Sequence, residues 1–349
     1  MTSPSLSPLL SVIILNYNGL RWVDRCVQTL KEQTIFSQIE ILIADNQSTD
    51  TSDKAFEKAI QDWPNARFIQ NGGNFGFCEG NNLPAKVAKG KYLLFLNNDV
   101  WLEPDCLEIL LREVQAANAQ GAMPLILNYD DNTVQTAGGA GYDIFGFISW
   151  VAGYSHTREI FIPNGCCFLI EKNLFDKLGG FDKEFFMYAD EYDLAWRLSV
   201  AGGKSILVPA SRLHHRSAAN VNPKGVEKIV ELRTSDMKRF YANRNTFLLL
   251  LKNCQHILLL LLPMQLSLVA TETLVLGLVT RRWSFIKTTF LNAINDCWRL
   301  RHHVRNERRK LAPLRIRSDW WMLRFLRWRL NRWYELMLVR RLGLPKVMK

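Results

Sequence analysis

The first half of the chain alternates short apolar runs with amphipathic segments, and this alternation limits the fold more than any other feature. Four runs rich in β-forming residues are predicted to be strands: residues 11–15, 39–44, 66–69 and 91–96. Residues 21–33 and 51–62 have the pattern of helices, and Ser48 or Asp50 could cap the second helix. We therefore predict an α/β fold, a Rossmann-like, mostly parallel sheet flanked by helices.

Polar residues follow three of these apolar runs directly, in residues 16–19, 45–48 and 97–99. In sheets of this kind, ligands bind beyond the carboxyl ends of the strands, so the three segments predict one polar ligand site. An alternative for the second segment is a simple turn followed by a helix cap. A dinucleotide site is not expected, because no GxGxxG sequence follows the first run.

The stretch from residue 117 to residue 162 is glycine-rich and irregular, and its pattern assigns no element. Two further strands are predicted at residues 166–170 and 205–208, and the second runs towards His214-His215. Cys166 and Cys167 are interpreted as strand core. The chain has 7 Cys without a CxxC pair, which argues against a disulfide framework or a zinc ribbon and favours a reducing compartment.

The character of the chain changes after residue 246. Ile257–Val279 has 23 residues with one charge, which is long enough to cross about 30 Å of hydrocarbon. Pro263, Gln265 and Glu272 weaken the case for a full span, so spanning and in-plane placement both stay open. An amphipathic helix is predicted farther on. Its apolar face would hold Met322, Leu326, Leu330, Trp333 and Met337, and its polar face Arg324, Arg327, Asn331 and Glu335.

Charge is distributed unevenly along the chain. The net charge is +11, yet the stretch from Arg281 onward carries 15 Arg and 4 Lys against four acids, or +15, which leaves −4 for the first 280 residues. Six of the 11 Trp lie in the same basic stretch. His302-His303 also lies there among arginines, and we interpret this histidine pair as part of a solvated face. Arginine and tryptophan beside an apolar run favour an anionic membrane surface. Nucleic acid is not expected as a partner, because no known binding module is recognisable there.

The N-terminal ten residues lack a basic segment, so no secretory signal is predicted there. The 48% hydrophobic content excludes a disordered chain, and 20 Gly with 12 Pro exclude a fibrous one.

Five motifs occur in a fixed order: VIILNYN, ADNQSTD, NGGNFGFCEGNN, LLFLNNDV and FFMYADEYDLAWR. In this order they resemble the family 2 glycosyltransferases of the GT-A fold, and among them the bacterial enzymes called rhamnosyltransferases. The resemblance covers residues 11–245, about two-thirds of the chain. It implies a catalytic domain over residues 1–245, followed by a helical membrane-association region over residues 246–349. It also implies transfer of a sugar from a nucleotide-diphosphate donor to an acceptor hydroxyl with inversion.

The same resemblance implies a set of donor-binding residues. Base and ribose contacts would fall on Asn16, Asn18 and Asp45, whose amide and carboxylate groups suit a pyrimidine edge and ribose hydroxyls. Further positions that match the family's donor-side pattern are Asn74, Gly76, Phe77, Asn82 and Asn98. Pro84 departs from the pattern, and we expect it to fit an early helical turn.

A divalent cation, Mn²⁺ or Mg²⁺, is implied at Asn98-Asp99, which matches the acidic metal-binding motif of the fold. Such a cation bridges the two phosphates and neutralises the leaving group. Only Asp99 is a carboxylate, because the first acidic position of the motif is missing. His215 is the candidate second ligand, with His214 as the alternative, and an imidazole suits Mn²⁺ better than Mg²⁺.

The catalytic base is implied within the segment ADEYDLAWR. The family usually has Glu-Asp there, whereas this chain has Asp190-Glu191, the same charges in swapped order. Position favours Glu191 as the base and residue type favours Asp190; we predict Glu191, with the other acid capping or bracing a helix. Asp193 and Arg197 are spaced to form an i,i+4 ion pair. Arg244-Asn245 resembles a sequence common directly after the catalytic domain.

Together these features predict an inverting glycosyltransferase of bacterial cell-surface polysaccharide synthesis. Its donor would be a nucleotide sugar such as dTDP-rhamnose, its acceptor a glycan or lipid-linked sugar, and its location the cytoplasmic face of the inner (plasma) membrane. The missing first acid and the swapped acid pair motivate an alternative: a non-catalytic membrane-bound protein that uses the fold to bind nucleotide or a partner.

Overall fold

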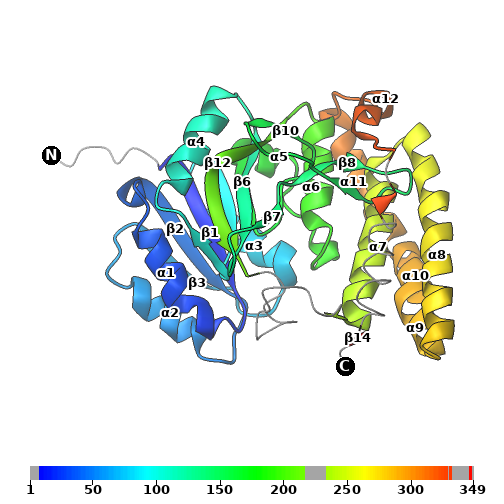
Figure 1. Cartoon of the computed structure of the whole chain (residues 1–349), viewed down its shortest axis with the longest axis horizontal. Coiled ribbons are helices and arrows are strands. Elements are labelled where there is room, and N and C mark those ends of the chain that lie inside the picture. The colour runs from blue at the N-terminus through cyan, green and yellow to red at the C-terminus, as the bar shows by residue number, and fades with distance from the viewer. Residues whose placement is uncertain (1–7, 217–232, 329, 332–345, 348–349) are drawn as a thin grey trace.

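The computed structural model describes residues 8–216, 233–328, 330–331 and 346–347. An α/β part and a helical part lie side by side (Figure 1). Within the described residues the α/β part contains a ten-stranded sheet with the main order β10-β12-β6-β11-β4-β1-β2-β3, while β5 pairs with β12 and β7 with β6.

Four mutually parallel strands form one side of this sheet, as the sequence predicts. They are β1 (Leu10–Asn16), β2 (Ile39–Asp45), β3 (Ala66–Gln70) and β4 (Tyr92–Asn97). Buried residues of β1 alternate between two cores: Val12 and Ile14 pack on one face and Ile13 on the other. A central strand covered on both faces therefore has the continuous apolar run seen in the sequence.

The other side of the sheet is mixed. Its strands are β5 (Val100–Leu102), β6 (Gly121–Asn128), β7 (Val134–Thr136), β10 (Arg158–Ile160), β11 (Cys167–Glu171) and β12 (Ser205–His215). β11 runs antiparallel to both β4 and β6, whereas β12 runs parallel to β6. A separate hairpin joins β8 (Gly139–Tyr142) to β9 (Ile148–Trp150). The stretch without a predicted element thus contributes short strands, and the α/β fold class is confirmed.

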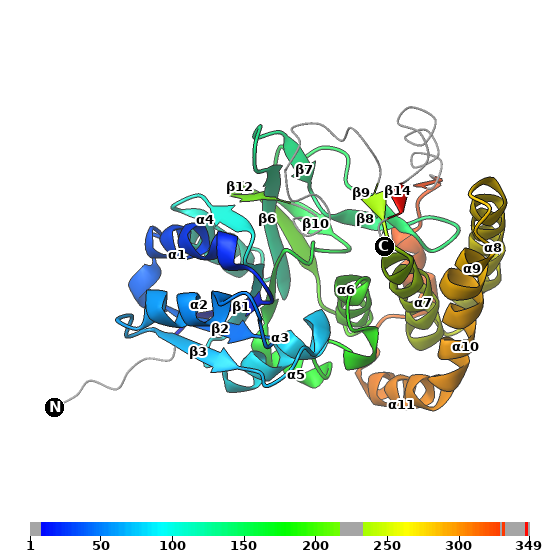
Figure 2. The same ribbon diagram turned by 90° about the horizontal axis from the view of Figure 1, so that it is seen from below.

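Helices cover both faces of the sheet (Figure 2). One face packs against α1 (Val23–Lys31), α2 (Ser52–Ile60) and α4 (Cys106–Ala116), and the other against α3 (Gly76–Val87), α5 (Lys172–Lys177) and α6 (Asp190–Val200). Short 3₁₀ turns lie at Leu20–Trp22, Phe36–Gln38 and Lys183–Phe185. All seven cysteines are buried free thiols, and Cys166 and Cys167 lie in the core, as predicted for these two.

Pro84 is predicted to fit an early helical turn, but it lies well inside α3. A proline there removes the hydrogen bond that its nitrogen would donate to the carbonyl of Gly80. Asn71 compensates, because its Nδ2 donates to that carbonyl at 3.1 Å. The helix therefore continues to Val87.

The helical part begins with α7 (Asp236–Asn253), which lies between α6 and the following helices in both views (Figures 1 and 2). It continues with a 3₁₀ turn (Ile257–Leu260), α8 (Leu261–Val279), α9 (Trp283–Ile286), a π-helical turn (Lys287–Leu291), α10 (Asn292–Arg299), α11 (Arg301–Leu311), a 3₁₀ turn (Ala312–Leu314) and α12 (Asp319–Met322). Because α7 is continuous across residue 245, the predicted domain boundary falls within a helix. Two short strands, β13 (Arg233–Thr234) and β14 (Lys346–Val347), pair in parallel.

The predicted amphipathic helix over residues 322–337 is wrong in its first half. After α12 the chain makes one 3₁₀ turn (Leu323–Phe325), and Leu326 is extended and forms a bridge with Tyr142. Its neighbour Arg327 donates from its backbone to the Tyr142 carbonyl at 2.8 Å. Pairing with β8 thus replaces the helical hydrogen bonds that the pattern predicts. Trp333, Glu335 and Met337 lie outside the described residues.

Candidate active site

Asn16 connects the carboxyl ends of three strands. Its Nδ2 donates to Asp45 Oδ1 at the end of β2 (2.7 Å) and to Ser52 Oγ at the start of α2 (2.8 Å). Its Oδ1 accepts from Asn98 Nδ2 beyond β4 at 2.9 Å. Asn16 is fully buried, so its amide orders the three polar segments that the sequence predicts to meet.

Asn18 and Asp45 hold the two loops beyond β1 and β2 together. Asn18, at φ 53°, accepts on its Oδ1 from the Thr49 backbone at 2.8 Å. Asp45 accepts from the Ser48 backbone on Oδ2 (2.8 Å) and from Ser48 Oγ on Oδ1 (2.6 Å). These contacts of Asp45 fit the turn part of the turn-and-cap interpretation. The predicted cap is wrong, because the N-cap of α2 is Thr51 rather than Ser48 or Asp50, and its side chain makes no cap hydrogen bond. Binding of Asp45 to a donor stays a prediction.

The glycine-rich segment forms the start of α3. Asn74 Oδ1 accepts from the Gly76 backbone at 3.1 Å, and Gly76 has a φ of +70°. A β-carbon on Gly76 would lie 2.5 Å from the Phe186 carbonyl oxygen, so only glycine fits there. The Phe77 backbone donates to that same carbonyl at 2.7 Å.

Asn82 and Phe77, two of the predicted donor-binding residues, contact Phe181 of the same chain. Asn82 Nδ2 donates to the Phe181 carbonyl (2.8 Å), and its Oδ1 accepts from the Phe181 backbone (2.9 Å). The Phe77 ring packs edge-on against Phe181. Both residues therefore fasten α3 to the segment that leads to the acid pair.

Asp99 and His215 lie side by side because β12 pairs antiparallel with β5, with His215 opposite Val100. His215 Nε2 is 3.4 Å from Asp99 Oδ1, and its Nδ1 is 2.8 Å from Gln135 Oε1. Burial disfavours the charged imidazole, but Cys166 and Asp99 outweigh it and raise the pKa of His215 to about 10. Gln135 orients the ring, a role that the sequence pattern did not reveal.

His214 faces a different environment from His215. Its ring stacks on Trp101 with 4.1 Å between centroids, and its Nε2 is 3.4 Å from Glu103. Of the two neighbouring histidines, the structure thus places His215 and not His214 beside Asp99.

The Asp99–His215 pair fits two positions of a divalent-cation site. No cluster of three or more His, Cys, Asp or Glu side chains is found among the described residues. A carboxylate and a neutral imidazole suit Mn²⁺, so a cation would displace the proton that the raised pKa keeps on His215, and two protein ligands leave coordination positions for phosphate oxygens and water.

The acid pair Asp190-Glu191 begins α6; Asp190 is buried and Glu191 is half-buried. Burial, and then the neighbouring charge of Glu191, raise the pKa of Asp190, and burial raises the pKa of Glu191. A β-carbon on Gly165 would lie 3.6 Å from Glu191 Cδ, so Glu191 borders that glycine. The next residue, Cys166, accepts from the Asn97 backbone at 2.9 Å, which brings Glu191 to the end of β4.

The segment before the acid pair is strained. Phe186, Tyr188 and Ala189 have φ values of 60°, 68° and 58°, a region that non-glycine residues rarely adopt. Three such residues within four positions need outside support, and α7 provides it.

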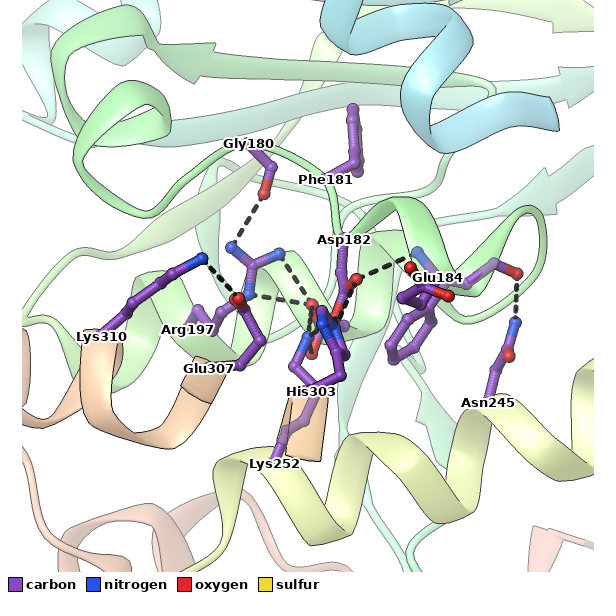
Figure 3. Close-up of polar contacts among 12 residues, drawn as sticks. Gly180, Phe181, Asp182, Glu184, Arg197, Asn245, Lys252, His303, Glu307 and Lys310 are labelled. Atoms are coloured by element: carbon purple, nitrogen blue, oxygen red, sulfur yellow. Dashed lines mark hydrogen bonds and ion pairs between the residues drawn. The ribbon is translucent and has the colours of Figure 1, made fainter. Parts of the chain in front are cut away.

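Asn245 on α7 donates from Nδ2 to the carbonyls of Phe185 (2.9 Å), Met187 (2.8 Å) and Tyr188 (2.8 Å). Arg244 donates to the carbonyls of Glu184 and Phe185 and pairs with Asp296 of α10 at 2.8 Å. Figure 3 shows Asn245 reaching this segment from α7. The family-like Arg244-Asn245 sequence therefore holds the strained segment 184–189.

A buried ionic cluster lies next to this contact (Figure 3). Lys252 of α7 pairs with Asp182 and with Asp193 of α6, and Arg197 pairs with Asp193 at 2.7 Å, the predicted i,i+4 pair. His303 of α11 is 2.9 Å from Asp182, so its interpretation as part of a solvated face is wrong. Burial opposes ionisation of both aspartates, but Lys252 with His303 lowers the pKa of Asp182, and Arg197 with Lys252 lowers that of Asp193.

The fold is that of the GT-A glycosyltransferases. Staphylococcus aureus TarS 1–349, solved with UDP, matches with a TM-score of 0.57 and 13% identity over 94% of this chain and 91% of that one. GalNAc-T7, solved with UDP, GalNAc and Mn²⁺, matches with a TM-score of 0.53 and 20% identity over 61% of this chain and 44% of that one.

The sequence identifies the family within this fold. The profile described as "Glycosyl transferase family 2" matches residues 11–188, about half of the chain, and the chain belongs to that family. It is 29% identical to "O-antigen biosynthesis protein RfbC" of Myxococcus xanthus over 61% of this chain but only 18% of that protein's length. It is 27% identical to "N-acetylglucosaminyl-diphospho-decaprenol L-rhamnosyltransferase" of Mycobacterium tuberculosis over 61% of this chain and 78% of that protein.

Proposed function

We propose that this chain transfers a sugar from a nucleotide-diphosphate sugar to an acceptor hydroxyl with inversion, in the synthesis of a bacterial surface polysaccharide. One observation carries the proposal. The Asp99–His215 pair and the acid Glu191 border the same end of β4, next to polar loops that Asn16 joins. Such a site offers a diphosphate position and a base within one region.

Residue roles follow from these positions. Glu191, whose pKa burial raises, accepts the acceptor hydroxyl's proton when ionised. Asn98, Asn16 and the loop of Asp45 and Asn18 orient the nucleotide. A divalent cation held by Asp99 and His215 would neutralise charge on the departing diphosphate.

The donor and acceptor belong to the same proposal. The name of the Mycobacterium relative supports a rhamnosyl donor such as dTDP-rhamnose and a lipid-linked acceptor. TarS was solved with UDP and with UDP-GlcNAc, so UDP-sugars are the alternative donors. Thermal-shift screening against dTDP-, UDP- and GDP-sugars, with and without Mn²⁺, tests which donor binds and whether its binding needs the metal. A single stabilising donor whose effect requires Mn²⁺ supports the proposal, and no stabilisation by any of them contradicts it.

Turnover of Glu191→Gln and Asp190→Asn assigns the base. Both substitutions remove one charge with little change in shape, so they are matched controls for each other. We expect Glu191→Gln to abolish transfer and Asp190→Asn to retain it in part. The reverse pattern assigns the base to Asp190. Asp99→Ala is expected to abolish turnover as well.

A second candidate function is nucleotide or partner binding without catalysis. Its support is that the polar groups of Asn16 and Asp45 already bond within the protein and that Asp99 stands without a preceding carboxylate. Binding of a nucleotide sugar, without transfer to any extracted lipid-linked acceptor, would favour it.

We also propose that the helical part associates with the cytoplasmic face of the inner membrane. Ile257–Val279 has the length and apolar composition of a spanning helix, with 28% of its most apolar window buried. Leu274, Leu278 and Trp283 are exposed by 48%, 51% and 63%, beside Arg281 and Arg282. Exposed apolar and aromatic residues beside arginine suit an anionic bilayer. Binding to nucleic acid stronger than to vesicles would contradict this.

A further inference from the structure

An apolar groove lies between α7, α8, α10 and α11, the helices at the far end of the molecule from β3 (Figure 2). Its volume is about 460 Å³, within the range of about 300–1,000 Å³ found for ligand pockets. Its walls are Phe247, Leu251, Leu259, Leu262, Leu266, Ile294, Cys297, Trp298 and Val304, together with three arginines.

The three arginines, Arg301, Arg305 and Arg308, all come from α11, and among the residues that the structure describes no carboxylate lines the groove. Arg308 is fixed in place because it donates to the carbonyls of Leu251 (2.7 Å) and Cys254 (2.5 Å) at the end of α7. Arg301 lies over the Trp298 ring at 5.0 Å. Arg305 is exposed and makes no hydrogen bond or ion pair with the described residues, so its guanidinium is available to an anion.

The mouth of the groove is itself apolar. Ile294 and Trp298, which line it, are exposed by 39% and 67%. α8 continues this character away from the groove, with Leu274 and Leu278 about half exposed. The exposed apolar residues at the mouth and those of α8 thus belong to the same helical part, which we propose to meet the membrane.

We propose that this groove binds an anionic phospholipid of the bilayer, with an acyl chain along the apolar walls and the phosphate at Arg301 and Arg305. Apolar walls beside a row of arginines on α11, with no carboxylate among the described lining residues, match a molecule with a hydrocarbon tail and an anionic head. The proposal rests on the proposed membrane association and adds a defined lipid site to it.

The test uses the full chain purified in detergent, examined by native mass spectrometry for retained lipid and by flotation with vesicles. One set of vesicles is pure phosphatidylcholine and the other contains phosphatidylglycerol. We expect one phosphatidylglycerol retained per chain. Leu262→Trp fills the groove and Arg305→Gln removes a free cation, and both should lose the retained lipid.

Arg309→Gln is the matched control, because Arg309 is also exposed on α11 but does not line the groove. Both arginine variants remove one charge, so each should weaken vesicle binding about fivefold. Only Arg305→Gln should lose the retained lipid. Since Arg305 is exposed, that variant is expected to fold, which unchanged thermal unfolding would verify.

Several outcomes overturn the proposal. If the wild type floats with anionic vesicles but retains no lipid, or if Arg305→Gln and Arg309→Gln retain it equally, the groove is not a phospholipid site while membrane association stands. A retained polyprenyl phosphate assigns the groove to another lipid. A dimer that Leu262→Trp dissociates assigns it to a second copy of the chain. No flotation of the wild type removes the membrane proposal as well.

Discussion

Asp190 is buried and its neighbour Glu191 is half-buried, and desolvation makes both carboxyl groups hold their protons to higher pH than ordinary acids do. A general base works only when ionised. Because burial raises the pKa of Glu191, the acid limb of the activity profile should lie above the ordinary glutamate value of about 4.3.

The first prediction follows from this shift. The rate of transfer, measured from pH 4 to pH 9, should rise through a midpoint above that of an exposed glutamate. The charge of Glu191 raises the pKa of Asp190, so Asp190 still holds its proton when Glu191 ionises, and Asp190→Asn should leave the midpoint little changed. A midpoint that falls clearly in Asp190→Asn would show that Asp190 is ionised beside Glu191 in the wild type.

The second prediction concerns Asn245, a positioning residue that touches the strained segment and not the reacting atoms. Asn245→Ala removes three hydrogen bonds to the segment that presents the acid pair. We expect kcat to fall about 10–100-fold, as for loss of the orientation of a catalytic group, with the donor KM little changed.

Asn243→Ala is the matched control, because Asn243 is a buried asparagine of the same helix that bonds instead to the Thr289 carbonyl at 3.0 Å. It should affect stability but not kcat. An equal loss of kcat in both variants would mean that α7 acts only through general stability. Asn245→Asp, which keeps the shape but cannot donate, should not restore activity.

At the residue scale, sequence reasoning located the side chains that terminate strands, because a strand's end fixes where its next residues lie. Asn16, Asp45 and Asp99 are such residues, and the structure places them at adjacent strand ends. It did not find Gln135 or the contacts of Asn245. These depend on pairings across 80 and 57 residues of sequence, which no local pattern contains.

At the scale of elements, α6 and α7 are joined by charges inside the protein. Lys252 lies between Asp182 and Asp193 and is 2% exposed. Removing one member of such a buried group leaves the others without compensation, which costs about 3–5 kcal/mol. The contact between the α/β part and the helical part should therefore depend strongly on this lysine.

The third prediction is that Lys252→Met lowers the free energy of unfolding by about 3 kcal/mol at pH 7 in urea titrations. Asp182 and Asp193 have lowered pKa values in the folded state. Their stabilisation is thus present above about pH 3.9, the value for free aspartate, and is lost as pH falls through the folded values. The deficit of the variant should shrink under acid.

Lys310→Met is the control, because Lys310 pairs with Glu307 while its side chain stays 73% exposed. An exposed pair contributes about 0–1 kcal/mol. Similar losses in the two variants would contradict a special role for the buried cluster.

Element prediction succeeded where one face or both faces of a segment are buried in a regular core. The four parallel strands and helices α1 and α2 have that simple environment. It failed beyond Met322, where Leu326 bridges to Tyr142 instead of continuing a helix. The periodicity there is real, but pairing with a strand distant in sequence decides the backbone.

At the scale of the whole molecule, the exposed apolar residues concentrate on the helical part. The fourth prediction is that Leu274→Ser with Leu278→Ser weakens vesicle binding without changing thermal unfolding, because both side chains are about half exposed. Each substitution should cost about 1 kcal/mol, or about fivefold in the vesicle partition coefficient.

Val87→Ser is the matched control, since Val87 of α3 is exposed by 48% but belongs to the α/β part. It should bind vesicles like the wild type. Equal binding by all three proteins would place the membrane contact elsewhere.

Arg244 connects the helical part to the segment that presents the acid pair. Its guanidinium bonds to the backbone ahead of the acid pair and also to Asp296, directly before two residues that line the groove. A small displacement of α10 on docking would therefore act through Arg244 on the segment that presents the acid pair. We expect the rate of sugar transfer to be low in solution and to increase when the protein binds lipid vesicles. Measuring turnover before and after vesicles are added tests this.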